Sequence, residues 1–174
     1  MKIYALKTSP AFEAALYTGV RLAGPVEQYE KLVADFSRNI GVAFQILNDL
    51  KDWGGDDDNK LVAGQDVLSA RPTLLLALAL EGSSPAQREE LLHLLHQPLA
   101  ASRPDRVRDI YFAAKVFEKA DKLVDKFRAK AESLADEVQP TEFRELLYYL
   151  VDTVLEKGEL PKRGVTQFVE LGRV

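Results

Sequence analysis

The sequence predicts an all-α protein. Apolar residues recur at intervals of three and four positions along almost the whole chain, which is the spacing of amphipathic helices. No segment alternates apolar and polar residues between hairpin turns, as a half-buried strand would. The chain has 174 residues, of which 47% are hydrophobic, and this is enough for one domain with a substantial core.

Start and stop signals place the helices in order. The first is predicted to begin at Thr8-Ser9-Pro10, where a hydroxyl N-cap precedes a proline at the first helical position, and to stop near Gly24-Pro25. A second helix over 27–53 ends at a glycine pair, and a loop follows it. Further helices are predicted over 73–81, 86–96, 107–138 and 140–157. We treat 1–157 as one helical domain and 158–174 as a C-terminal extension without assigned structure.

Composition narrows the class of partner. The 27 acidic and 23 basic side chains are scattered, with no basic arm of the kind that a nucleic acid attracts, so we expect no nucleic-acid partner. The absence of cysteine excludes disulfides and thiolate metal sites and is compatible with a cytoplasmic location, which we expect. The longest apolar run, 74–80, is far shorter than the roughly 20 residues that span a bilayer, so we expect no transmembrane segment.

The helix predicted over 27–53 has one polar side. At about 100° per residue, Asn48, Asp49 and Asp52 lie within about 60° of Gln45. Apolar residues cover the opposite face and both flanks, so the helix is expected to be buried nearly all round. Neighbouring buried carboxylates repel one another, and each loses hydration worth several kcal/mol, unless a cation lies between them.

This set of donors indicates Mg²⁺. Oxygen ligands without nearby histidine or cysteine suit a hard cation, and Mg²⁺ held by few carboxylates shares its coordination shell with water and substrate phosphate. The pattern therefore predicts a phosphorylated substrate. The alternative is a solvated helix end, which is the better interpretation of the acidic run 56–59, whereas we favour the metal for Asp49 and Asp52.

Three segments form motifs that occur together in one family: KTSPAFEAALYTGVRLAG (7–24), FQILNDLKD (44–52) and GQDVLSARPTLLLALAL (64–80). They resemble the KT segment, the second aspartate-rich motif FQxxDDxxD and the GxDxxxGKPTxPxxxAL segment of the trans-isoprenyl diphosphate synthases, or polyprenyl synthetases. Their order and spacing are close to those of the family, and the resemblance covers about residues 4–157.

The resemblance implies an Mg²⁺-dependent prenyltransferase that joins an allylic diphosphate head-to-tail to isopentenyl diphosphate. It implies that Asp49 and Asp52 bind Mg²⁺ bridging to the allylic diphosphate, with Asn48 at a position where aspartate is usual. A class I terpene cyclase is a further alternative, because NDLKDWGGD (48–56) can be compared with the metal motif NDxxSxxxE of those enzymes. The other two motifs favour the synthase.

Basic and polar residues are carried over from the same motifs. Lys7 and Thr8 match the KT pair and Gln45 matches the motif glutamine, all implied near the diphosphate or the developing allylic cation. Arg71 replaces the lysine of GKPT, and Lys60 lies beside the leucine that stands where the family has lysine, so both are implied substrate contacts. A helix N-terminus at Thr8 would add backbone donors.

One family motif is absent. The family fold is an all-α barrel around a prenyl cavity, with a first DDxxD motif in its N-terminal half, and nothing before Lys7 matches that motif. The chain thus resembles the C-terminal half of the barrel. We expect activity only with a complementary chain that has the first motif, and a homo-oligomer when the chain is alone. A non-catalytic all-α regulatory or interaction subunit is the main alternative.

Overall fold

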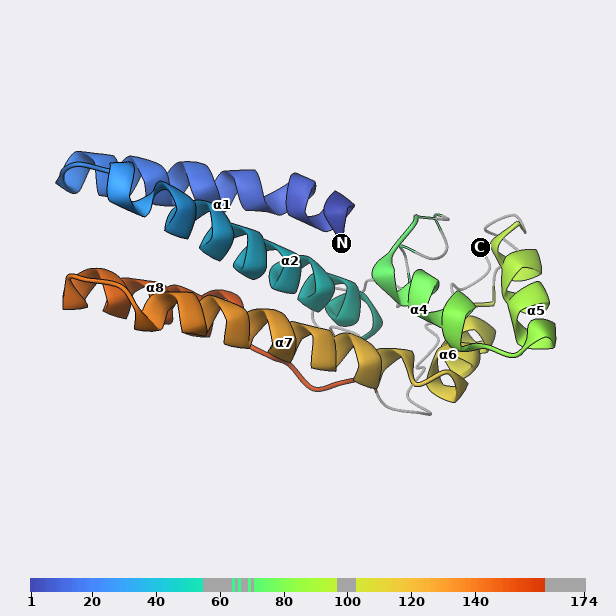
Figure 1. Cartoon of the computed structure of the whole chain (residues 1–174). Helices are drawn as coiled ribbons and strands as arrows, with labels where there is room; N and C mark the ends of the chain where they lie inside the picture. Colours follow the sequence, from blue (N-terminus) through green and yellow to red (C-terminus); the bar gives the residue numbers. More distant parts are fainter. Residues whose placement is uncertain (55–63, 65, 67–68, 70, 97–102, 162–174) are drawn as a thin grey trace, which may run out of the picture. The chain divides into compact units, whose positions relative to one another are not determined.

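The computed structural model describes residues 1–54, 64, 66, 69, 71–96 and 103–161 (Figure 1). No β-strand occurs in these ranges, which confirms the all-α class. None of the helices in them is both long enough and apolar enough to cross a bilayer. The elements are α1 (Lys2–Ala23), the 3₁₀ helix η1 (Glu27–Tyr29), α2 (Glu30–Gly54), α4 (Leu74–Gly82), α5 (Pro85–Leu95), α6 (Pro104–Ala113), α7 (Val116–Asp136) and α8 (Thr141–Val154).

The chain divides into two compact units; two of the three boundaries fall inside α2 and α7, and the third follows Gly158. Unit 1 contains residues 1–51 and 118–158, and the described part of unit 2 contains residues from 52–117 and 159–161. Unit 1 therefore holds the long helices, and unit 2 holds the short ones, α4, α5 and α6.

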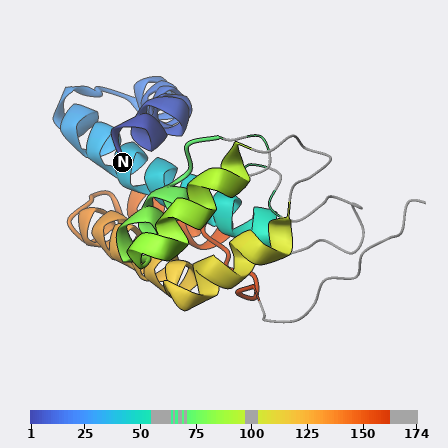
Figure 2. The same ribbon diagram turned by 90° about the vertical axis from the view of Figure 1, so that its right-hand side faces the viewer.

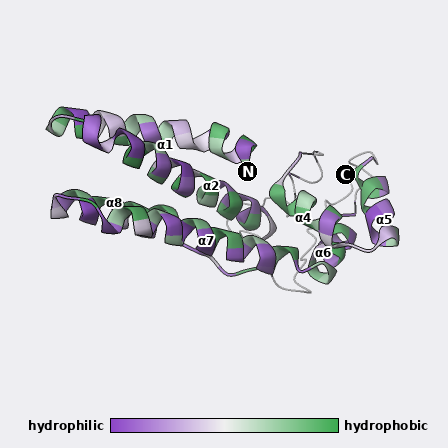
Figure 3. Ribbon diagram, in the orientation of Figure 1, coloured by the Kyte–Doolittle hydropathy of each residue, from purple (hydrophilic) through white to green (hydrophobic). Residues whose placement is uncertain are grey.

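The long helices of unit 1 run lengthwise beside one another (Figures 1 and 2). α1 and α2 are antiparallel, because Tyr4 near the start of α1 contacts Asp49 near the end of α2, while Phe12 meets Phe44 with ring centroids 6.2 Å apart. The buried hydrophobic residues of these helices form the core, and Figure 3 marks the hydrophobic positions along each ribbon. Core side chains that are 4% exposed or less come from α2, α7 and α8 and include Phe36, Ile40, Leu47, Ala131, Ala135, Leu147 and Val151.

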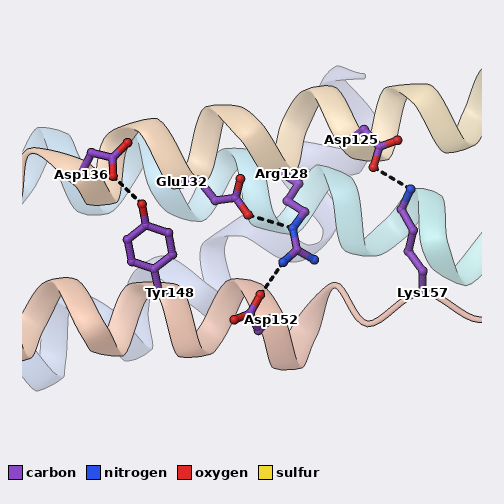
Figure 4. A network of polar contacts seen from close by, with 7 residues as sticks. All are labelled: Asp125, Arg128, Glu132, Asp136, Tyr148, Asp152 and Lys157. Atoms are coloured by element: carbon purple, nitrogen blue, oxygen red, sulfur yellow. Dashed lines mark hydrogen bonds and ion pairs between the residues drawn. The ribbon is translucent and has the colours of Figure 1, made fainter.

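Polar contacts join α7 to α8 and the residues that follow it (Figure 4). The Nε of Arg128 lies 2.8 Å from Glu132 Oε1 on the same helix, and the guanidinium also pairs with Asp152 of α8. The Nζ of Lys157 lies 2.7 Å from Asp121 and 2.6 Å from Asp125. Partial burial works against the charge on Lys157, but hydrogen bonds to the two aspartates outweigh it and raise the pKa of the ammonium. Such partly exposed pairs contribute about 0.2–1 kcal/mol each, so their main effect is to fix the register of two antiparallel helices.

Unit 2 has an aromatic centre and helices with clear caps. The rings of Trp53, Tyr111 and Phe117 lie 5.0–6.0 Å apart between centroids, and all three are buried. The side chain of Thr73 caps α4 by accepting a hydrogen bond from the backbone N–H of Leu76 at 3.2 Å. A reciprocal capping box opens α5. Both helices begin within two residues of the predicted positions because these caps are local signals in the sequence.

The predicted start of the first helix is wrong. α1 begins at Lys2, and Pro10 lies inside it. A proline inside a helix removes one backbone hydrogen bond and costs about 3 kcal/mol, so the sequence alone favoured a start at Thr8. Tyr4, which precedes Pro10 on the same helix, is buried, and burial of its ring favours the additional turns before the proline. Thr8 is thus within a helix, and the helix N-terminus that was predicted to offer backbone donors there does not exist.

The single helix predicted over 107–138 is also wrong. α6 ends at Ala113 and α7 begins at Val116, with Lys115 in the left-handed region at φ 54°. In one continuous helix Tyr111 and Phe117 would point about 120° apart around the axis. The break lets both rings enter the same cluster, and the sequence between them contains no glycine or proline to signal it.

The strained turn gives a test of this break. We expect Lys115→Val to lower the free energy of unfolding by about 1–2 kcal/mol, because a β-branched residue tolerates positive φ poorly, and Lys115→Gly to be neutral or stabilising. The matched control is Lys119→Val, an exposed position inside α7, where only helix propensity changes, by about 0.5 kcal/mol. Urea unfolding measures all three, and equal losses for the two valine variants would contradict the left-handed turn.

Candidate metal centre

The end of α2 bears the polar residues that the sequence singled out. Residues 45–53 lie within one continuous helix, so spacings of three and four positions place Gln45, Asp49 and Asp52 on one side. Gln45 and Asp49 are buried, at 6% and 8% exposure, whereas Asp52 is half-buried and Asn48 is exposed. Their apolar neighbours on α2 are buried as predicted, namely Val42, Ala43, Ile46, Leu47, Leu50 and Trp53.

Asp49 has a hydrogen-bond partner that sequence reasoning missed. The hydroxyl of Tyr4 on α1 donates to Oδ2 of Asp49, and Tyr4 itself is 8% exposed. Tyr4 stands three positions before Lys7, which is one helical turn. An aromatic residue one helical turn before the KT pair is the signal for this contact in the sequence.

A close contact between α1 and α2 holds Tyr4 beside Asp49. A Cβ added to Gly41 of α2 would lie 2.6 Å from Ser9 Oγ and 2.9 Å from Ser9 Cα on α1. Real Cβ atoms do not approach so closely, so only glycine allows the two backbones this separation. The edge-to-face pair of Phe12 and Phe44 packs in the same interface.

The implied diphosphate contacts of unit 1 gather at this end of the helix pair. Lys7 is exposed and Thr8 is half-buried, one turn beyond Tyr4. Because α1 and α2 are antiparallel and Tyr4 meets Asp49, the turn with Lys7 and Thr8 lies beside the turn of Gln45. The KT and FQ motifs, which the sequence predicted separately, therefore lie on neighbouring turns of unit 1.

Asp52 is held by a different segment, within unit 2. Its Oδ2 accepts a hydrogen bond from the backbone N–H of Asp66 at 3.3 Å, and its carbonyl accepts one from Gly64 N–H at 3.0 Å. Gly64 has φ +79°, and a Cβ there would lie 2.9 Å from the indole ring of Trp53, so the turn requires glycine. The Gly64 and Asp66 positions of the third motif thus hold the last aspartate of the second motif in place.

Arg71 is committed to an ion pair. Its Nη1 lies 2.9 Å from Asp66 Oδ1, and its backbone N–H donates to the Asp66 carbonyl. The side chain is 69% exposed, so a phosphate could also reach the guanidinium N–H groups that do not contact Asp66. Lys60, its neighbour Leu61 and the acidic run 56–59 lie outside the described residues.

The chemistry of the donors decides what kind of metal they fit. In the described part of the chain, no three His, Cys, Asp or Glu side chains stand close enough together to enclose a metal ion. Asp49 and Asp52 offer two carboxylates on successive turns of α2. Two carboxylates are a poor cage but suit Mg²⁺ that completes its shell with water and phosphate. The residues therefore fit the predicted Mg²⁺, whose assignment stays a prediction.

Known proteins are similar to this chain in sequence and in fold. Residues 1–113 match the polyprenyl synthetase family model. Octaprenyl diphosphate synthase from Escherichia coli K12 is 34% identical over 99 residues, which cover 56% of this chain and 30% of that protein. The structure of a geranylgeranyl pyrophosphate synthetase from Pyrococcus horikoshii superposes with a TM-score of 0.77 at 22% identity, over 91% of this chain and 48% of that one.

A further structural relative contains ligands. It is a geranylgeranyl pyrophosphate synthase from Corynebacterium glutamicum complexed with isoprenyl diphosphate and magnesium, with a TM-score of 0.65 and 24% identity over 78% of this chain and 39% of that one. At these identities the structural likeness shows a shared fold. The chain spans less than half the length of each of these three relatives.

Proposed function

We propose, because this chain belongs to the polyprenyl synthetase family, that it forms the second aspartate-rich wall of an isoprenyl diphosphate synthase. The reaction would be the Mg²⁺-dependent condensation of an allylic diphosphate with isopentenyl diphosphate. The proposal rests on one observation above all: Asp49, in the motif FQILNDLKD, is a buried carboxylate near the end of α2, among buried apolar residues and beside the turn that holds Lys7 and Thr8.

Each proposed role follows from charge and position. Asp49 and Asp52 would hold Mg²⁺, with Asn48 as a neutral oxygen donor, and the metal when bound would stabilise the charge that develops on the leaving diphosphate. The ammonium of Lys7 is exposed and can pair with the same diphosphate. Gln45, buried one turn before Asp49, would present its amide to the substrate rather than to bulk water.

Lys60, Arg71 and Thr8 complete the proposed substrate contacts. Thr8 has a hydroxyl on the same turn as Lys7, where it can bind a phosphate oxygen. Arg71 would bind phosphate through the guanidinium N–H groups that do not contact Asp66. The role of Lys60 rests on the family resemblance alone.

Metal binding should depend on the diphosphate. Because Mg²⁺ keeps much of its water and Asn48 is neutral, we expect weak Mg²⁺ binding to the chain alone and clearly tighter binding when an allylic diphosphate analogue is present. Isothermal titration calorimetry measures both. We expect Asp49→Ala and Asp52→Ala each to abolish the coupled binding, while Asp35→Ala, a half-buried aspartate earlier on α2, leaves it unchanged. Coupled binding that survives both site substitutions would show that the metal is held elsewhere.

An exposed apolar stripe on α1 supports the proposed complementary partner. Ile3, Leu6 and Tyr17 are 66%, 77% and 40% exposed, and Pro10 and Ala14 between them are also exposed. These positions fall on one face of α1, about 110° around the helix axis from the buried Ser9 and Leu16. Their spacing is that of a helix seam, so a helix from a partner is the matching surface. We propose that a chain with the first DDxxD motif covers this stripe, and that self-association covers it otherwise.

The stripe gives a test of association. We expect the chain alone to form a dimer or larger oligomer at micromolar concentration in light scattering, and Leu6→Glu to shift it toward monomer, because a charge in the seam cannot be buried without cost. Leu92→Glu is the matched control, since Leu92 is 42% exposed on α5 and is not one of the residues of the stripe. A stable monomer in the unsubstituted chain would contradict the proposed interface.

The neutral Asn48 favours the alternative of a regulatory subunit. An assay of catalysis distinguishes that alternative from the synthase. We expect linear prenyl diphosphate products only when the chain is mixed with a partner that contains the first DDxxD motif, and loss of at least about 100-fold in activity with Asp49→Ala, as expected when a charge-stabilising group is removed. Product analysis by mass spectrometry measures this. Absence of activity both with and without that partner would support the regulatory subunit. Cyclised hydrocarbon products would support a terpene cyclase.

A further inference from the structure

We propose that Tyr4 is a positioning residue that orients the Asp49 carboxylate and thereby sets the affinity of the site for magnesium diphosphate. This inference rests on the proposed function and extends it to a residue outside the three family motifs. Its basis is the hydrogen bond from the Tyr4 hydroxyl to Oδ2 of Asp49, which joins positions 45 residues apart in the sequence.

The surroundings make this bond a specific one. Tyr4 and Asp49 are each 8% exposed, so water has little access to either group. The bond crosses the interface between α1 and α2, whose separation is fixed by the close contact of Ser9 with Gly41. The packing of the two helices therefore holds the phenol against one carboxylate oxygen, so the hydrogen bond is preorganised.

A neutral donor suits a carboxylate that must bind a cation. A hydrogen bond to one oxygen fixes the side-chain rotamer without cancelling the negative charge, whereas a lysine or arginine partner would neutralise the group before a metal arrived. Carboxylates that bind metals are commonly held by hydrogen bonds of this kind. Removing the group that donates such a bond typically lowers metal affinity by about 10–100-fold. Tyr4 meets the requirements of such a partner: it is neutral, it is buried, and it lies in the interface between α1 and α2.

The same residue links the metal site to the diphosphate contacts. Tyr4, Lys7 and Thr8 lie within five consecutive residues of α1, which is little more than one helical turn. A change that moves Tyr4 away from Asp49 would also move the ammonium of Lys7. We therefore infer that this turn of α1 acts on binding of magnesium and of diphosphate together.

The experiment compares two tyrosine hydroxyls. In the full chain, Tyr4→Phe removes one oxygen from the site, and we expect the affinity for Mg²⁺ in the presence of inorganic pyrophosphate to fall by about 10–100-fold in isothermal titration calorimetry. Tyr29→Phe is the matched control. Its hydroxyl donates to the Gln139 carbonyl at 2.6 Å, at the opposite end of α2, so we expect unchanged affinity.

The outcomes distinguish this inference from the proposed function. Unchanged or tighter binding in Tyr4→Phe, with binding lost in Asp49→Ala, overturns the role of Tyr4 and leaves the metal site standing. Binding that survives Asp49→Ala, or is absent from the unsubstituted chain, overturns the metal site and the role of Tyr4 with it. If Tyr4→Phe unfolds more readily than Tyr29→Phe, Tyr4→His and Tyr4→Ala are compared instead. The ring N–H of histidine can donate to Asp49, so we expect Tyr4→His to bind Mg²⁺ more tightly than Tyr4→Ala does. Equal affinities of these two variants overturn the inference.

Discussion

A carboxylate buried on an apolar helix needs a partner, and much of unit 1 follows from how Asp49 obtains one. Leaving such a charge without a partner would cost several kcal/mol. The Tyr4 hydroxyl meets this need, which requires α1 to extend well before Thr8 and to lie antiparallel to α2. The tolerated proline at position 10 and the close contact at Gly41 are consequences of the same arrangement.

The sequence predicted those features whose cause is local. Helical periodicity located α2 and α8, and α4 and α5 begin within one residue of the predicted starts. It failed where distant contacts override a local signal. Pro10 resembles a helix start until the burial of Tyr4 is known, and nothing near Lys115 shows that the chain must turn so that two aromatic rings can share one cluster.

The candidate site was predictable as a set of residues but not as a set of contacts. The motif spacing identified Gln45, Asp49 and Asp52 because a helix converts intervals of three and four into one face. It could not show that Asp49 is held by α1 in unit 1, or that Asp52 is held by the backbone of Asp66 in unit 2. Such partners come from other segments of the chain, and no local pattern encodes them.

The contact at Gly41 sets the separation of α1 and α2, and this separation affects the hydrogen bond between Tyr4 and Asp49. Gly41 stands eight positions before Asp49, about 12 Å away along α2. Any larger residue there would push α1 outward and lengthen the reach from the phenol to the carboxylate. Selection for function would therefore act on a position that touches neither metal nor substrate, and natural variation at Gly41 would tune the acidic end of α2 from a distance.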